Sequence, residues 1–164
     1  MSPTYPAPAP VLQSGEYIIT SVSTGLKVSR TLAEDKSLLP KKVVILPAKE
    51  QASTWEVTRN RDGTYTLKNK GSPVVEIDDL LFAQLTGPPL ETRWKISSVY
   101  WQGSDQWIIE NLSGSDGWLL NAATGPAKEY KQIDVGPLIA TLSLPPQYPA
   151  NERFRFTRVR ATVG

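Results

Sequence analysis

Hydrophobic and polar residues alternate along this chain in short runs, which are separated by glycine, proline and other turn residues. No window keeps apolar residues at the i, i+3, i+4, i+7 spacing of an amphipathic helix. Short runs rich in β-branched and aromatic residues are typical of strands, so the pattern predicts an all-β protein. The predicted strands lie at residues 16–23, 26–30, 42–48, 54–60, 64–69, 74–78, 93–99, 106–112, 117–122, 131–139 and 153–159.

Two aromatic motifs recur along the chain and divide it into three units. In one motif an aromatic residue precedes aliphatic and polar residues, as at Tyr17, Tyr65 and Trp107. In the other an aromatic residue leads a strand, as at Trp55, Trp94 and Phe154. The motifs alternate at separations of 38, 29 and 47 residues within the units, so the strands recur while the loops vary in length.

This recurrence predicts a β-trefoil of about twelve strands in three pseudo-repeats, because repeated units of this kind close a barrel around one axis. The repeated aromatic residues are expected in its core, where large side chains bury the most surface. Trp101 and Trp118 fall outside the shared register. We expect one domain at residues 12–164, preceded by a flexible, proline-rich tail at residues 1–11.

The composition gives no reason to expect a nucleic-acid or membrane partner. The 164 residues carry a formal net charge of only +2, with lysine and arginine scattered along the chain. No apolar run approaches the roughly 18 residues that a membrane span needs. The N-terminal stretch lacks the basic and apolar segments of a signal peptide, so we expect a cytoplasmic protein, and a monomer.

The chain contains no cysteine and no histidine. This removes disulfides, thiol nucleophiles, Ser-His-Asp arrangements and the commonest metal ligands. Carboxylates cluster only at Glu34–Asp35 and at Glu76–Asp79, where neighbouring residues do not converge on one point. No glycine-rich phosphate loop follows a strand and opens a helix. We therefore expect no enzymatic activity, no cofactor and no metal site.

The long, charged segment at residues 31–41 joins the second and third predicted strands. A substrate-like protease inhibitor needs an exposed, extended loop with one side chain that fills the primary pocket of the enzyme. A trypsin-like pocket takes lysine or arginine, because a carboxylate lies at its base. Lys36, followed by Ser37 and by the restrictive Pro40, meets this requirement. A solvated surface lysine is equally consistent with the spacing.

A carbohydrate-binding trefoil is an alternative hypothesis. Such a pocket needs an acid, an exposed aromatic residue and an amide, and Asp116, Trp118 and Asn121 supply these in the third unit. The matching segments of the first two units have no aromatic residue. The run at residues 113–117 is equally explained as a tight turn.

The run GLKVSRTLAEDKSLLPKKVVILP, followed by TWEV, LLFAQL, GW and QIDVGPLI…PPQYPANERFRF, resembles the small fungal serine-protease inhibitors of the cospin type. Members of that group are cysteine-poor β-trefoils, related in fold to the mycocypin inhibitors of cysteine proteases. The resemblance extends over residues 15–159. It implies inhibition of a trypsin-like serine protease through the loop at residues 31–41, with a basic residue in the primary pocket.

The resemblance makes Lys36 the first candidate for the inserted residue, with Asp35, Ser37 and Leu38 beside it. Arg30, where the strand gives way to the loop, is the second candidate. The carboxylate of Asp35, next to the candidate Lys36, offers no evident favourable contact with trypsin.

Mycocypin-like inhibition is a further alternative. Mycocypins hold specificity for a second protease class in the loop between the first two strands of the second unit. That loop contains Lys70, and also Asn69 as a candidate against an asparaginyl protease. Inhibition of cysteine proteases in the mycocypin mode relies on glycine-rich loops, and the corresponding segment here offers only Gly25.

Overall fold

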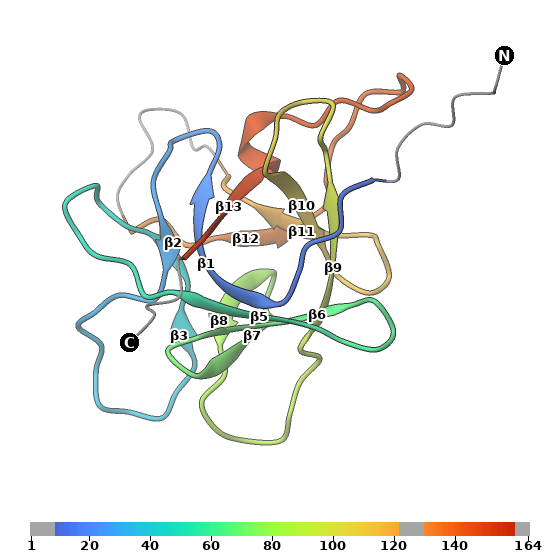
Figure 1. The fold of residues 1–164 in the computed structure, drawn as a ribbon. Coiled ribbons are helices and arrows are strands. Elements are labelled where there is room, and N and C mark those ends of the chain that lie inside the picture. Colours follow the sequence, from blue (N-terminus) through green and yellow to red (C-terminus); the bar gives the residue numbers. More distant parts are fainter. Residues whose placement is uncertain (1–8, 122–129, 160–164) are drawn as a thin grey trace, which may run out of the picture.

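The computed structural model describes residues 9–121 and 130–159, and within them it confirms an all-β protein (Figure 1). One turn of 3-10 helix, η1 (Ala150–Glu152), precedes the last strand. β3 and β4 are two pieces of one predicted strand, interrupted at Val43. The strands are β1 (Gly15–Ser21), β2 (Val28–Ser29), β3 (Lys41–Lys42), β4 (Val44–Ile45), β5 (Trp55–Arg59), β6 (Tyr65–Asn69), β7 (Ser72–Ile77), β8 (Leu80–Ala83), β9 (Arg93–Ser98), β10 (Gln106–Glu110), β11 (Gly117–Leu119), β12 (Asp134–Gly136) and β13 (Phe154–Arg158).

Six strands close a barrel through antiparallel pairs that run β1–β5–β6–β9–β10–β13 and back to β1. Each sequence unit supplies two of these strands. Hairpins β2–β4, β7–β8 and β11–β12, one from each unit, lie beside the barrel and are linked through β3–β8 and β8–β12. This arrangement, seen in Figure 1, is the predicted β-trefoil.

The aromatic residues of the two sequence motifs meet as cross-strand partners in the barrel. The pairs are Tyr17 with Trp55, Tyr65 with Trp94, and Trp107 with Phe154. All six side chains are buried in one hydrophobic core. The alternation of the motifs along the chain is therefore the alternation of barrel strands within each unit, and the predicted core is confirmed.

Trp118, which lies outside the repeat, is fully buried at the centre of this core. Its ring centroid lies 5.7 Å from those of Trp55 and Trp94 and 5.9 Å from that of Phe154. The indole Nε1 is buried and has no hydrogen-bond partner. A sugar-stacking ring must be exposed, so the suggested sugar site at Asp116, Trp118 and Asn121 lacks its aromatic platform.

β8 was not among the predicted strands, although it forms a hairpin with β7. The two residues between them, Asp78 and Asp79, have φ angles of +52° and +62°. Positive φ at both positions is the mark of a type I′ hairpin turn, which usually carries Asn-Gly or Asp-Gly. The sequence Asp-Asp lacks the glycine that usually identifies this turn, and both aspartates occupy turn positions of the hairpin.

The predicted tail at residues 1–11 lies mostly outside the described residues, and Leu12 is already part of the core. Among the described residues no helix is long and apolar enough to cross a membrane.

Candidate functional site

The loop at residues 30–40 leaves β2 and returns as β3, between the second and third strands of the first unit as expected. In Figure 1 it is the light-blue loop that stands clear of the barrel at the lower left. Four of its side chains are large and exposed, and they are Leu32, Lys36, Leu38 and Leu39. The remaining polar residues of the loop bind one another or the barrel.

Arg30 anchors the start of the loop from within the protein. Its side chain is buried, and its guanidinium donates to both carboxylate oxygens of Glu34, from Nε at 3.0 Å and from Nη2 at 2.8 Å. The remaining Nη1 donates to the backbone carbonyl of Asn69 at 2.9 Å. In this structure Arg30, the second candidate, is buried and braces the loop, so Lys36 is the more accessible of the two candidates.

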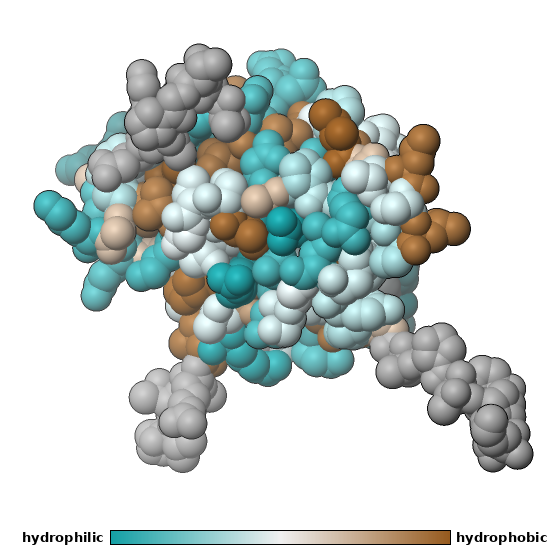
Figure 2. Space-filling view, turned by 90° about the horizontal axis from the view of Figure 1, so that it is seen from above, coloured by the Kyte–Doolittle hydropathy of each residue, from teal (hydrophilic) through white to brown (hydrophobic). Residues whose placement is uncertain are grey.

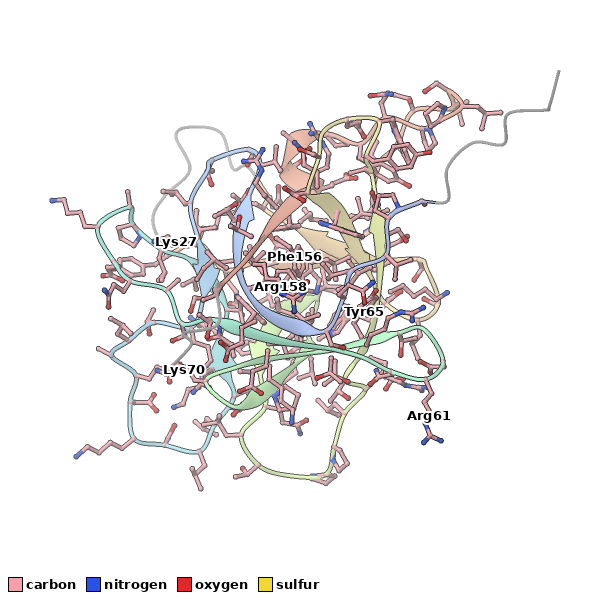
Figure 3. The ribbon with its side chains drawn as sticks, in the orientation of Figure 1. Lys27, Arg61, Tyr65, Lys70, Phe156 and Arg158 are labelled. Atoms are coloured by element: carbon pink, nitrogen blue, oxygen red, sulfur yellow. The ribbon has the colours of Figure 1, made fainter. Side chains whose placement is uncertain are left out.

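Two residues of the second unit hold the same part of the loop: Asn69, the last residue of β6, and Lys70, in the turn that follows. The Oδ1 of the fully buried Asn69 accepts bonds from the backbone N–H of Arg30 at 3.2 Å and from the Ser29 hydroxyl at 3.3 Å. Lys70, labelled in Figure 3, donates to the backbone carbonyl of Thr31 at 3.0 Å. Asn69 is therefore inaccessible to a protease in this structure, whereas Lys70 braces the loop and remains exposed at the surface.

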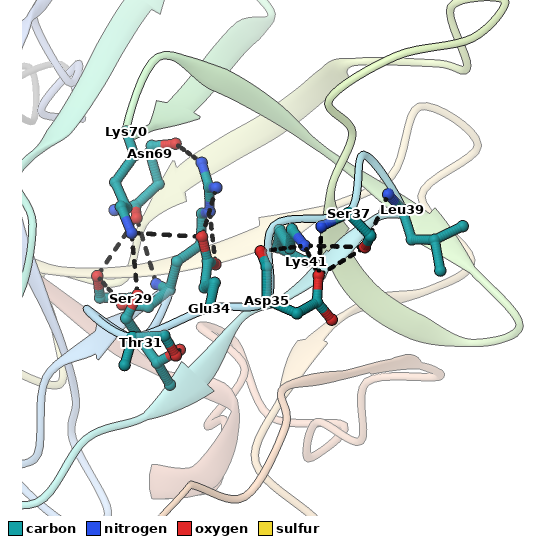
Figure 4. A network of polar contacts seen from close by, with 11 residues as sticks. Ser29, Thr31, Glu34, Asp35, Ser37, Leu39, Lys41, Asn69 and Lys70 are labelled. Carbon is teal, nitrogen blue, oxygen red and sulfur yellow. Dashed lines mark hydrogen bonds and ion pairs between the residues drawn. The ribbon is translucent and has the colours of Figure 1, made fainter.

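Lys41 anchors the other end of the loop. Its side chain is buried, and its Nζ donates to the backbone carbonyl of Asp35 at 3.1 Å and to the Asp35 carboxylate at 2.5 Å (Figure 4). The same carboxylate oxygen accepts the backbone N–H of Ser37 at 3.0 Å and also the Ser37 hydroxyl. The chain bends at Lys36 and Ser37, so the segment is a turn with Lys36 inside it, where an extended segment was expected.

Both acids of the loop have lowered pKa values. The Asp35 pKa falls to about 2, chiefly because Lys41 donates to its carboxylate and also because Ser37 does. Burial raises the pKa of Glu34, but the hydrogen bonds and charges of Arg30 and Lys70 outweigh it, so the net pKa is below the ordinary value. Both carboxylates are ionised at neutral pH, and both form ion pairs that hold the loop in place.

Lys36 differs from these residues because it is exposed and makes no hydrogen bond or ion pair within residues 9–121 and 130–159. The loop beyond it is supported by a second loop, since the Thr86 hydroxyl donates to the backbone carbonyl of Leu38 at 3.3 Å. The site therefore combines a backbone held on both sides with a free cation between the anchors.

The residues proposed for sugar binding do not form a comparable site. Asp116 and Asn121 line a cavity of about 580 Å³ beside β12, and Trp118 does not line it. Across the part of the chain that the structure describes, no three Asp, Glu, His or Cys side chains converge as metal ligands.

Comparisons with known proteins show the family of this chain. Residues 10–158 match the family described as peptidase inhibitor I66. A serine protease inhibitor from Lentinula edodes is 35% identical over 149 residues, which span 90% of this chain and 99% of that protein. A proteinase inhibitor structure from Coprinopsis cinerea matches with a TM-score of 0.84 and 40% identity, over 90% of this chain and 99% of that one.

A ricin B-like lectin from Macrolepiota procera, solved with lactose, matches with a TM-score of 0.65 over 92% of this chain and 99% of that one. Its identity is only 14%, so this likeness shows the trefoil fold alone. The family match covers the barrel and the loop, and its members are inhibitors and not enzymes. The chain belongs to the I66 family of peptidase inhibitors.

Proposed function

We propose that this chain inhibits a trypsin-like serine protease by presenting Lys36 to the primary pocket of the enzyme. Membership of a peptidase-inhibitor family supports a protease as the partner. The similarity to the Lentinula edodes serine protease inhibitor supports the serine class. The observation that carries the proposal is the free, exposed Lys36 between two anchored stretches of backbone.

The chemistry of Lys36 suits a pocket with a carboxylate at its base. A lysine side chain offers an apolar stem that fills a narrow slot and an ammonium that pairs with the buried acid. No acid within the described residues competes for this ammonium, because Glu34 and Asp35 are bound to Arg30, Lys70 and Lys41. The neighbouring Asp35 is therefore already neutralised by Lys41 when the enzyme approaches.

The anchors reduce the cost of binding. A flexible loop loses conformational freedom when an enzyme orders it, and a braced loop has lost that freedom on folding. The carbonyl before Lys36 is held by Lys41, and the N–H after Lys36 is held by Asp35. Lys36 itself is exposed in the bend between these two held groups, where an enzyme can approach it.

Leu38 and Leu39 add apolar surface beside the lysine. Their exposed fractions are 64% and 69%, high for leucine side chains on a folded protein. The hydroxyl of Thr86 fixes the carbonyl of Leu38, so this surface keeps its place next to Lys36. The two leucines are assigned to contacts with the enzyme surface on the side of the pocket that follows Lys36.

Titration of bovine trypsin with the wild type and with Lys36→Ala tests the proposal. Loss of the pocket residue should raise the inhibition constant by at least about 30-fold, since truncating a central interface residue costs roughly 2 kcal/mol or more. Arg61→Ala is the matched control, because Arg61 is another exposed basic residue, at the β5–β6 turn (Figure 3). It should inhibit like the wild type.

Two results would contradict the proposal. If the wild type leaves trypsin fully active at micromolar concentration, the protein is not a trypsin inhibitor. If Lys36→Ala inhibits as strongly as the wild type, Lys36 is not the residue that enters the pocket. Arg30→Ala does not serve this test, since its buried brace would be lost together with the loop conformation.

A further inference from the structure

A second loop, at residues 137–149 between β12 and η1, exposes more apolar surface than the first. Leu142 is 102% exposed and Leu144 is 96% exposed, and Ile139 at the base of the loop is 73% exposed. In Figure 1 this orange loop projects at the upper right, away from the barrel. Figure 2 looks onto that end of the molecule and shows hydrophobic side chains standing out at its edge. Leucines this exposed gain no burial on folding, and exposed apolar residues grouped on one loop can mark an interaction site.

Hydrogen bonds on both sides of Leu142 hold the tip of the loop. Thr141 donates its backbone N–H to the carbonyl of Gln147 at 3.0 Å, and its hydroxyl accepts the Gln147 N–H at 2.9 Å. The hydroxyls of Thr141 and Ser143 are 2.6 Å apart. The two neighbours of Leu142 are thus joined to each other, and the leucine side chain projects from between them.

Buried and half-buried side chains from the β9–β10 connection and from η1 bind the base of the loop. The indole of Trp101 donates to the carbonyl of Pro146 at 2.7 Å. Gln102 makes a reciprocal pair with the backbone of Tyr148, donating at 2.9 Å and accepting at 2.8 Å. The buried carboxylate of Glu152 accepts the N–H of Ile139 at 2.8 and 3.0 Å. Trp101, which the repeat left unassigned, therefore supports this loop.

We propose that the loop at residues 137–149 is a second protease-binding site, in which Leu142 enters the large apolar primary pocket of a chymotrypsin-like enzyme. The loop has the same design as the first one, with an exposed residue between neighbours whose backbone or side chains are tied. A leucine favours a pocket without a charge. Its apolar side chain gains from burial there, whereas in a trypsin-like pocket it would leave the carboxylate at the base unpaired. This inference goes beyond the first loop and does not depend on Lys36.

The two loops point in different directions. In Figure 1 the loop at residues 30–40 projects at the lower left and the loop at residues 137–149 at the upper right, with the barrel between them. Two separate enzymes can therefore be bound by one inhibitor. A preformed complex with trypsin should still inhibit chymotrypsin, and a ternary complex should elute as a single peak in size-exclusion chromatography.

Inhibition of α-chymotrypsin by the wild type, Leu142→Ala and Ile139→Ala tests the second site. Leu142→Ala should raise the inhibition constant for chymotrypsin by at least about 30-fold and leave inhibition of trypsin unchanged. Ile139→Ala is the control, because it removes an exposed apolar side chain from the same loop while the backbone bond to Glu152 remains. In a Lys36→Ala background, Leu142→Lys should create inhibition of trypsin at the second loop.

Three outcomes would overturn the inference. If chymotrypsin stays fully active with micromolar wild type, the protein has no such site. If Leu38→Ala loses inhibition of chymotrypsin and Leu142→Ala keeps it, chymotrypsin binds the first loop instead. A wild-type dimer that Leu142→Ala dissociates, with no inhibition of chymotrypsin, would show that the leucines serve self-association. Inhibition of trypsin and its loss in Lys36→Ala are measured separately in every case, so the two proposals fail separately.

Discussion

Lys41 holds Asp35 at two points, donating to its backbone carbonyl at 3.1 Å and to its carboxylate at 2.5 Å. The lysine is buried, at the first position of β3, while Asp35 stands on the exposed loop. The relationship fixes the residue before Lys36 to β3, which pairs with β8 beside the barrel. Under the proposed function it also accounts for an acid next to Lys36, since the charge of Asp35 is already paired with Lys41.

Lys41→Met should weaken inhibition of trypsin about tenfold, because the loop must then be ordered by the enzyme at a cost of roughly 1 kcal/mol for each side chain that is immobilised. Methionine keeps an apolar chain in the buried position and removes only the ammonium. The adjacent exposed Lys42, changed to methionine, is the control. Equal inhibition constants for the two variants would show that the anchor does not contribute to binding.

The bonds to the Asp35 carboxylate should respond to acid. Because its pKa is lowered from 3.8 to about 2, their contribution is complete above the unfolded value and is lost as the pH falls through the folded one. A carboxyl NMR titration should give a midpoint near the lower value, and in Lys41→Met the midpoint should move toward the ordinary value. A wild-type midpoint at the ordinary value would mean that the contact with Lys41 is absent in solution.

Glu34→Gln should lower the free energy of unfolding by about 1–3 kcal/mol, because the buried guanidinium of Arg30 loses its charged acceptor. The Glu34 pKa is lowered from 4.5, so this stabilisation is present above that pH and disappears as the pH falls through the folded value. Urea denaturation at neutral and acidic pH measures both effects. Glu56→Gln, at an exposed position on β5, is the control and should unfold like the wild type.

Trp55 and Trp118 offer a matched pair for the core. Both are fully buried, but the indole of Trp55 donates to the carbonyl of Val28 at 2.7 Å whereas that of Trp118 has no partner. Trp55→Phe removes packing contacts and a hydrogen bond, whereas Trp118→Phe removes packing contacts alone. Trp55→Phe should therefore be less stable than Trp118→Phe by about 1 kcal/mol, measured by urea denaturation. The reverse order would contradict the central, unbonded position of Trp118.

The barrel was predictable because large aromatic residues recur at equivalent positions of its strands and pair across them. Tyr17 and Trp55 recur in type and order in every unit, and their partners in the structure follow the same order. Strand β8 escaped prediction because its turn is Asp78–Asp79, without the glycine that usually marks a hairpin.

The loop was predictable in place but not in its internal contacts. Its length, charge and position between strands are visible in the sequence, whereas the burial of Arg30 and Asn69 depends on contacts between residues 39 positions apart. Local sequence gives no sign of which polar residues will pair across such a distance. The sequence likewise gives no reason to separate Lys36 from Lys41, one exposed and one buried.

A crystal structure of the complex with trypsin tests the central claim most directly. The proposal predicts that the Lys36 ammonium lies in the primary pocket and pairs with the carboxylate at its base, with Asp35 still bound to Lys41. A complex in which another residue fills that pocket, or in which Lys36 remains in solvent, would contradict it.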